Sequence, residues 1–213
     1  MPAFHRRSMI RLAAVGAAAL ALGFGVASCK KNGETAAGDM SMGSADAAVT
    51  VVEYASVTCS HCARWNEEVF PAFKAKYIDT GKVRYVFREF PTPPMEVATA
   101  GFLVARCAGD DKYFQVVDAI MRSQQEMFGS GDTSNARPVL LRIARSAGLT
   151  EQQFDACVTN EDAIRDLEER VQAGVAAGVD STPYFQVDGR RVGAGEASMA
   201  DFDAAIQPLL AGG

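Results

Sequence analysis

Apolar and polar residues along this chain follow the spacing of strands in some segments and of helices in others. Ala48 to Ala55 (AVTVVEYA) is a short apolar run rich in β-branched residues, which predicts a buried strand. Residues 63–78 carry apolar side chains at helical spacing, and Pro71 should kink this helix rather than end it. Residues 83–90 alternate like a second strand. Together these segments predict a β-α-β unit.

The next part of the chain is a long helical segment. Pro91-Thr92-Pro93-Pro94 ends the second strand, and from residue 95 to about 178 only helical patterns occur, with breaks at glycines. We therefore expect a helical insert over about residues 91–178. Residues 182–187 then read as a strand, Asp188-Gly189 as a two-residue hairpin turn, and residues 190–192 as its partner strand. An amphipathic helix over 198–210 completes a closing β-β-α unit.

The first 28 residues have the pattern of an export signal. Three arginines precede an uncharged apolar stretch of 15 residues from Leu12 to Val26, which is shorter than the roughly 20 residues that a spanning helix needs. Val26-Ala27-Ser28-Cys29 resembles the lipobox of bacterial lipoproteins. We therefore expect cleavage before Cys29 and lipidation of this cysteine, with the domain at the periplasmic face of a bacterial membrane. An uncleaved anchor, or an ordinary signal that releases a soluble periplasmic protein, remains the alternative.

The paired arginines of the signal region also resemble a twin-arginine signal, so the export route stays open. Beyond the signal, residues 29–47 are rich in Gly, Ala, Ser and Asp without periodicity, which predicts a flexible tether in which Met40 and Met42 are incidental. The folded domain is then expected over residues 48–213.

Composition limits the classes of function. The chain has 213 residues, of which 48% are hydrophobic, and this is enough for one domain with a full core. Its net charge of −5 gives no basic footprint for nucleic acid and argues against polybasic adhesion to anionic lipid. We expect a monomer that binds no nucleic acid.

The chemistry is concentrated in Cys59-Ser60-His61-Cys62, at the junction between the first strand and its helix. A thiolate is the nucleophile in disulfide exchange, and the N-H groups at a helix N-terminus stabilise an anion. Cys59 is placed to be this nucleophile, the His61 side chain can donate a hydrogen bond or a positive charge to its sulfur, and Cys62 should be the resolving thiol. A zinc site is the alternative, but structural zinc takes four ligands and removal of the signal leaves a single histidine. We expect no metal.

These elements resemble a thioredoxin fold, and the sequence is most similar to the DsbA-like thiol:disulfide oxidoreductase family. The resemblance covers about residue 48 to the end, and three motifs carry it: Val51 to Ser56 (VVEYAS), Cys59 to Cys62, and Thr182-Pro183. The implied fold class is α/β, a thioredoxin fold with an inserted helical subdomain. Ser60 departs from the family, in which many members carry proline, and this leaves the oxidising strength open.

The resemblance implies further site residues. Pro183 should be cis and face the cysteine pair, so that Thr182 and Pro183 shape a substrate groove and the Thr182 backbone pairs with an extended peptide; without the family a trans bond would be expected. Glu53 is similar to the buried acid of this family, which could relay a proton to or from Cys62. The alternative for Glu53 is an edge-exposed residue without a role.

Cys107 and Cys157 end two of the predicted insert helices, at Glu96 to Arg106 and at Glu151 to Val158. In an oxidising compartment neighbouring thiols do not stay reduced, which favours a structural disulfide between them. Closing this 50-residue loop would stabilise the fold by about 4 kcal/mol in the chain-entropy picture. Two separate buried thiols are the alternative.

The expected function is that of a dithiol oxidase that introduces disulfides into exported polypeptides through the Cys59-Cys62 pair, with no other cofactor. The resemblance implies a quinone-coupled membrane reoxidant of the DsbB kind. A disulfide isomerase or reductase is the alternative; the isomerase is disfavoured because isomerases of this superfamily carry an N-terminal dimerisation domain, and here only the expected tether precedes the first strand. A redox-silent binding module or chaperone is disfavoured because both cysteines are present.

Overall fold

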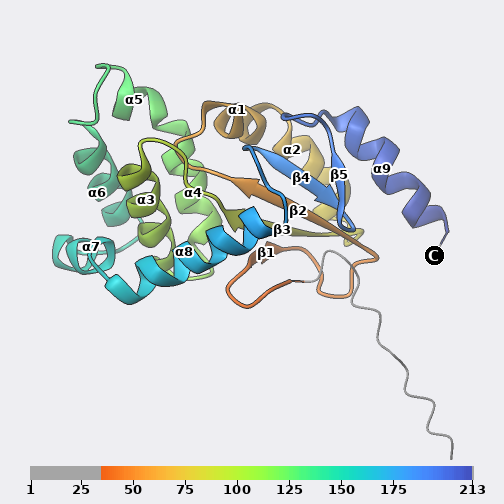
Figure 1. Ribbon diagram of the computed structural model, residues 1–213, viewed down its shortest axis with the longest axis horizontal. Coiled ribbons are helices and arrows are strands. Elements are labelled where there is room, and N and C mark those ends of the chain that lie inside the picture. Colours follow the sequence, from red (N-terminus) through yellow and green to blue (C-terminus); the bar gives the residue numbers. More distant parts are fainter. Residues whose placement is uncertain (1–34, 213) are drawn as a thin grey trace, which may run out of the picture.

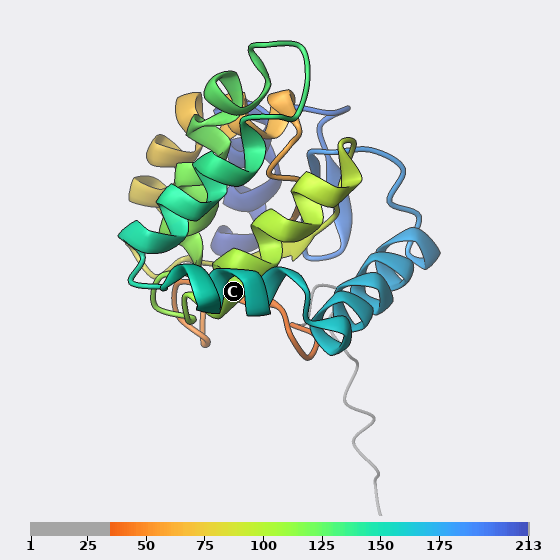
Figure 2. The ribbon, with the colours of Figure 1, turned by 90° about the vertical axis from the view of Figure 1, so that its left-hand side faces the viewer.

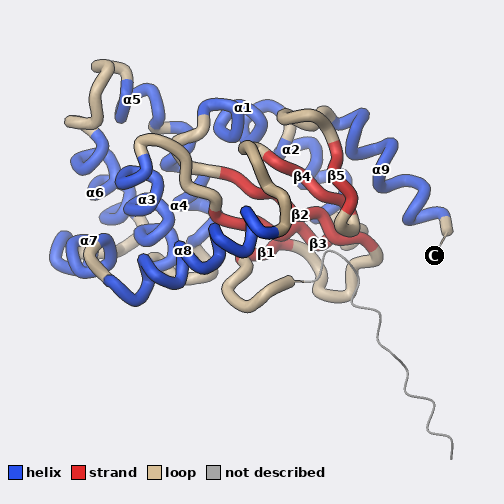
Figure 3. The backbone as a smooth tube through the Cα atoms, viewed as in Figure 1, coloured by secondary structure: helices blue, strands red, loops and turns tan. Residues whose placement is uncertain are grey.

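A five-stranded sheet with helices on both faces forms the centre of the protein (Figures 1 and 3). The computed structural model describes residues 35–212, so the predicted signal peptide and the predicted lipidation site Cys29 lie outside the described residues. The strands are β1 Met40–Met42, β2 Val49–Ala55, β3 Val83–Glu89, β4 Tyr184–Val187 and β5 Arg190–Val192, in the order β1-β3-β2-β4-β5. The helices are α1 Ser60–Glu68, α2 Phe70–Phe73, the π-type turn η1 Lys74–Ile78, α3 Met95–Cys107, α4 Tyr113–Arg122, α5 Gln124–Phe128, α6 Ala136–Ser146, α7 Glu151–Val158, α8 Glu161–Ala176 and α9 Met199–Ala211.

Strand β2 lies in the middle of the sheet. It pairs in parallel with β3 and antiparallel with β4, so that Glu53 lies opposite Phe87 on one side and Phe185 on the other. Side chains alternate between two cores: Val51 and Ala55 join the large core, and Val52 and Tyr54 join a smaller cluster beside α8. Burial on both faces explains why this strand reads as a continuous apolar run.

The helix predicted over residues 63–78 is divided into three pieces. Helix α1 begins at Ser60 and ends at Glu68, α2 carries Pro71 in its first turn, and η1 completes the segment. The expectation that Pro71 only kinks the helix is wrong, because a residue without a backbone N-H fits the first turn of a new helix. The cysteine pair is unaffected by this break, which lies at the far end of α1.

Helices α3 to α8 form the insert between β3 and β4, and Figure 2 shows most of them toward the viewer, with α8 running off to one side. Gly109 and Gly148 adopt positive φ values of 95° and 96° at the ends of helical segments. Thr150 and Gln153 form a capping box that begins α7 at the predicted residue. A disulfide joins Cys107 at the end of α3 to Cys157 in α7, with an S–S distance of 2.02 Å.

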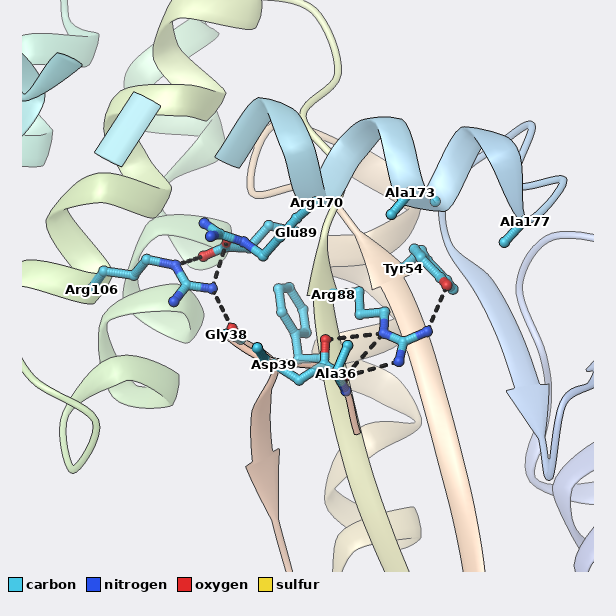
Figure 4. A pocket seen from close by; sticks show the side chains of 13 residues that line it. Ala36, Gly38, Asp39, Tyr54, Arg88, Glu89, Arg106, Arg170, Ala173 and Ala177 are labelled. Carbon is cyan, nitrogen blue, oxygen red and sulfur yellow. Dashed lines mark hydrogen bonds and ion pairs between the residues drawn. The ribbon is translucent and has the colours of Figure 1, made fainter. Parts of the chain in front are cut away.

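The segment before β2 is partly folded onto the sheet, so the prediction of a flexible tether up to residue 47 is wrong here. Strand β1 pairs antiparallel with β3. Arg88 Nε donates to Asp39 Oδ1 at 3.0 Å, and an Arg106 guanidinium nitrogen donates to the Gly38 carbonyl oxygen at 2.8 Å (Figure 4). These partners lie 49 and 68 residues away along the chain, so periodicity within the segment could not reveal them.

Glu89 connects the sheet to the insert. Its side chain is fully buried at the end of β3 and is paired with two cations from different helices: Arg106 Nε of α3 lies 2.7 Å from Oε1, and a terminal nitrogen of Arg170 of α8 lies 2.8 Å from Oε2 (Figure 4). The Tyr113 hydroxyl of α4 donates to Oε1 at 3.0 Å. One carboxylate therefore joins β3 to three helices.

We expect Glu89→Gln to lower the free energy of unfolding by about 3 kcal/mol, because it leaves two partly buried guanidinium groups without their anion. Urea unfolding followed by circular dichroism measures the loss. Glu126→Gln is the matched control, since Glu126 forms an exposed ion pair with Arg142 and its removal should change little. Equal losses in the two variants would contradict the role assigned to Glu89.

Candidate active site

Cys59 is the N-cap residue of α1, directly beyond the end of the central strand. Its backbone is extended, and its sulfur accepts a hydrogen bond from the Cys62 backbone N-H at 3.4 Å. The sulfur thus lies where unpaired N-H groups of a helix N-terminus favour negative charge. Cys59 is partly exposed, Cys62 is buried, and both are free thiols in the structure.

The surroundings of Cys59 favour its thiolate. The pKa of Cys59 is lowered from 9.0 to about 5, and the largest cause is the hydrogen bond from the Cys62 thiol. Burial opposes this shift, while a hydrogen bond with Thr182 and hydrogen bonds from the backbone N-H groups of Cys62 and His61 support it. At neutral pH the nucleophile is therefore ionised.

Cys62 has the opposite properties. Burial raises the pKa of the Cys62 thiol well above its ordinary value, and its hydrogen bond to Cys59 and the negative charges of Cys59 and Glu53 raise it further. One sulfur is therefore accessible and anionic, and the other is buried and protonated.

Glu53 lies below the cysteine pair on the central strand and is 2% exposed. The Tyr85 hydroxyl donates a hydrogen bond to its carboxyl group. Burial raises the pKa of Glu53 from 4.5 to about 8, the hydrogen bond from Tyr85 partly offsets this, and the charge of Cys59 adds to it. The structure excludes the alternative of an edge-exposed residue, because strands flank β2 on both sides.

Thr182 and Pro183 face the nucleophile from the loop before β4. The Thr182-Pro183 peptide bond is cis, and the Thr182 carbonyl oxygen lies 3.5 Å from the Cys59 sulfur, which donates a hydrogen bond to it in the protonated form. Two segments separated by more than 120 residues therefore meet at the sulfur.

The His61 side chain is placed differently from the sequence prediction. Its Nδ1 lies 2.5 Å from the Glu196 carboxylate and 2.8 Å from a guanidinium nitrogen of Arg64, so the imidazole contacts this pair rather than the Cys59 sulfur. The contribution of His61 to the thiolate comes from its backbone N-H. Arg64 could have been found from its spacing, since residues i and i+3 share a helix face. Glu196 lies in a loop that is distant in sequence, and no local sequence pattern pointed to it.

The loop that carries Cys59 depends on residues that sequence analysis did not single out. The Thr58 hydroxyl donates to the Thr92 carbonyl oxygen at 2.8 Å, and the Thr92 N-H donates to the buried Ser56 hydroxyl at 3.0 Å. From α5, the Gln124 amide donates to the carbonyl oxygens of Val57 at 2.8 Å and Cys59 at 3.1 Å. The insert therefore holds the backbone of the nucleophile.

The described residues 35–212 offer neither a metal-binding cluster nor a membrane-spanning helix. This part of the chain holds no group of three or more His, Cys, Asp and Glu side chains arranged for a metal ion. Nor does it contain a helix with the length and apolar character needed to cross a membrane.

Comparisons with known proteins agree with this geometry. A family model described as Thioredoxin matches residues 35–208. Among curated proteins, the chain is 35% identical over 123 residues to a protein-disulfide oxidoreductase of Rickettsia bellii, covering 58% of this chain and 46% of the relative. It is 33% identical over 156 residues to one of Rickettsia conorii, covering 73% and 55%. The chain thus spans about half the length of these relatives.

Solved structures give the same result. The crystal structure of Wolbachia pipientis α-DsbA1 matches with a TM-score of 0.73 and 26% identity, covering 84% of this chain and 94% of that one. The oxidised form of BdbD from Bacillus subtilis matches with a TM-score of 0.74 at 18% identity, covering 85% and 97%, which shows the fold alone. The predicted thioredoxin fold with a helical insert is confirmed.

We expect Cys62→Ala to raise the pKa of Cys59 above about 5, because the variant lacks the thiol that contributes most to thiolate stability. The pH dependence of iodoacetamide alkylation measures this pKa. Cys62→Ser retains a donor at the same position and should give a smaller rise. Equal rises in the two variants would show that the donor is not the cause.

Ionisation of Glu53 and of Cys59 should change the free energy of unfolding in opposite directions as pH rises. In reduced protein, the Cys59 thiolate makes the native state more stable as pH rises from about 5 to 9. The raised pKa of Glu53 contributes stability that is complete below 4.5 and is lost as pH rises through about 8. We therefore expect reduced Glu53→Gln to gain stability between pH 5 and 8 more steeply than reduced wild type. Urea unfolding at the two pH values tests this, and parallel profiles would contradict it.

Proposed function

Because the chain belongs to the thioredoxin family and resembles its DsbA-like members, we propose that it is a thiol:disulfide oxidoreductase that oxidises dithiols in exported polypeptides. One observation carries the proposal. The partly exposed sulfur of Cys59 lies at a helix N-terminus with a pKa of about 5, beside a buried thiol whose pKa is raised. The Cys59-Cys62 disulfide is itself the redox group, and the reaction needs no other cofactor.

In the first step, a substrate thiolate attacks the Cys59 sulfur of the oxidised enzyme. A bond forms between the two sulfurs, the Cys59-Cys62 bond breaks, and Cys62 leaves with the electron pair. A thiolate buried at Cys62 is unfavourable, so this sulfur takes a proton. Glu53 is protonated at neutral pH because its pKa is about 8, and its charge state influences the pKa of Cys62, so we assign Glu53 as the proton donor to this sulfur.

In the second step, another substrate thiolate attacks the substrate sulfur of the mixed disulfide. The substrate disulfide forms, and Cys59 leaves as a thiolate. Its low pKa makes it a good leaving group. The substrate has lost two electrons and the enzyme has gained them, so a reoxidant must remove them before the next cycle.

Whether the protein oxidises or reduces its substrates depends on whether the dithiol or the disulfide form of the Cys59-Cys62 pair is more stable. A dithiol whose thiolate is stabilised gives up electrons reluctantly, so its disulfide is a stronger oxidant. The low pKa of Cys59 therefore supports the oxidase over the isomerase or reductase. Ser60 between the cysteines is the position at which the oxidising strength of this protein can differ from that of its relatives.

The proposal includes partners and a location. An extended substrate would pair with the Thr182 backbone beside the sulfur, since the loop before β4 faces Cys59 there. The apolar signal pattern and the lipobox-like residues 26–29 support export and a lipid on Cys29 at the periplasmic face of a membrane. A quinone-coupled membrane protein of the DsbB kind would accept the electrons.

We expect Cys59→Ser to abolish oxidation of a dithiol peptide, because it lacks the attacked sulfur. With a peptide that already carries a disulfide, we expect Cys62→Ser to accumulate a mixed disulfide: the Cys59 thiolate attacks one peptide sulfur, the other peptide sulfur leaves as a thiolate, and the variant has no second thiol to release the peptide. Mass spectrometry of the quenched reactions measures both products. Equilibration of the wild type with a glutathione redox buffer separates oxidant from reductant. Equal trapping by the two variants would contradict the assignment of the sulfurs, and an equilibrium in favour of the disulfide at reducing poise would exclude the oxidase.

A further inference from the structure

The loop between β5 and α9 places one acidic side chain against α1, the helix that carries the cysteine pair. Glu196 Oε1 lies 2.5 Å from His61 Nδ1. Arg64 Nε lies 3.1 Å from both carboxylate oxygens of Glu196, and a terminal guanidinium nitrogen also contacts Oε1. His61, Arg64 and Glu196 thus form one cluster beside the nucleophile.

The backbone that directly follows Glu196 is held by α1 and by the start of α9. The buried Trp65 indole N-H donates to the carbonyl oxygen of Ala197 at 2.9 Å, and Ala197 is itself buried. Ser198 then caps α9 through a capping box with Asp201. Trp65 is adjacent to Arg64 on α1, so the same helix that carries the cysteines also positions the loop that reaches back to it.

The cluster determines where the imidazole lies. His61 is two residues after Cys59 and is 62% exposed, so its side chain has the freedom to turn toward the sulfur. In the structure its Nδ1 instead contacts the Glu196 carboxylate, to which a protonated Nδ1 donates, and the same nitrogen lies 2.8 Å from the Arg64 guanidinium. The carboxylate is 32% exposed and the guanidinium 48%, which leaves the contacts partly screened by water.

We propose that Glu196, together with Arg64, is a positioning residue that holds the His61 imidazole away from the Cys59 sulfur and so limits the oxidising strength of the cysteine pair. The inference rests on the proposed function and extends it to the regulation of the same site. With the imidazole held by Glu196, the thiolate is stabilised by the helix N-terminus, Cys62 and Thr182. Release of the imidazole would add a further donor, stabilise the reduced form and make the disulfide a stronger oxidant.

The charge balance of the cluster supports this direction. Glu196 is paired with the guanidinium of Arg64, so its negative charge acts weakly on the sulfur. Glu53, whose charge interacts with that of Cys59, is buried and is unchanged by a substitution at the surface. The effect of removing Glu196 should therefore pass through His61.

The first experiment is the thiolate absorbance titration of Cys59 in Glu196→Gln. We expect the pKa of Cys59 to fall by about half a unit, and the equilibrium with glutathione to shift about threefold toward the reduced enzyme, since exposed contacts rarely contribute more. Glu68→Gln is the matched control, because Glu68 is an exposed acid near Arg64 on the same helix and should leave both values unchanged. Glu196→Asp retains the charge and should stay close to wild type.

The second experiment is a double-mutant cycle with His61→Ala. If Glu196 acts through the imidazole, Glu196→Gln should have no effect on the pKa of Cys59 in the His61→Ala background. An effect of the same size in both backgrounds would overturn the proposal, because Glu196 would then act by its own charge. A rise in the pKa of Cys59 in the single variant would also overturn it.

Failure of this inference can be told apart from failure of the proposed function. The titration of Cys59 requires no substrate and reports on Glu196 whatever the protein does. A wild-type protein that cannot exchange disulfides with glutathione or a dithiol peptide would refute the proposed function, and the thiolate titration would still test the position of the imidazole.

Discussion

Acidic side chains buried within a sheet are costly to ionise because water cannot reach them, and residues 35–212 bury two of them, Glu53 and Glu89, on adjacent strands. Glu89 is compensated by two guanidinium groups and a tyrosine hydroxyl. Glu53 receives a hydrogen bond from Tyr85, and its pKa rises to about 8. The cost of burying a charge is therefore met in two ways. Glu89 is held in an ion cluster, and Glu53 keeps its proton at neutral pH.

The two acids also contact different parts of the fold. The partners of Glu89 come from α3, α4 and α8, so the cluster fixes the helical insert against the end of β3. Glu53 is on β2, whose C-terminal end leads directly to Cys59 at the start of α1. The strand thus places a protonated acid below the buried sulfur and delivers the exposed sulfur to the helix N-terminus, where its negative charge is stabilised.

Local sequence patterns were sufficient for features whose physical cause is local. The β-branched run at residues 48–55, the extent of the helix at residues 151–158 and the Cys59 to Cys62 spacing depend on neighbouring residues, and the cis bond at Pro183 was expected from the family resemblance. Features that depend on distant partners were missed. Strand β1 is three residues long and owes its position to pairing with β3, and the side chain of His61 is directed by Glu196, more than 130 residues away. A short strand and a single acid in a loop have no periodicity to detect.

The hydrogen bonds from Gln124 to the carbonyl oxygens of Val57 and Cys59 affect how such a fold can change during evolution. Helix α5 belongs to the insert, yet it holds the backbone beside the reactive sulfur. The insert is therefore not an independent module that can be exchanged freely between relatives. A chimera with another insert would need a donor at the same place, or a compensating change in the loop at residues 56–58. Residues at this junction should then vary together in related sequences, even though they are separated by more than 60 positions along the chain.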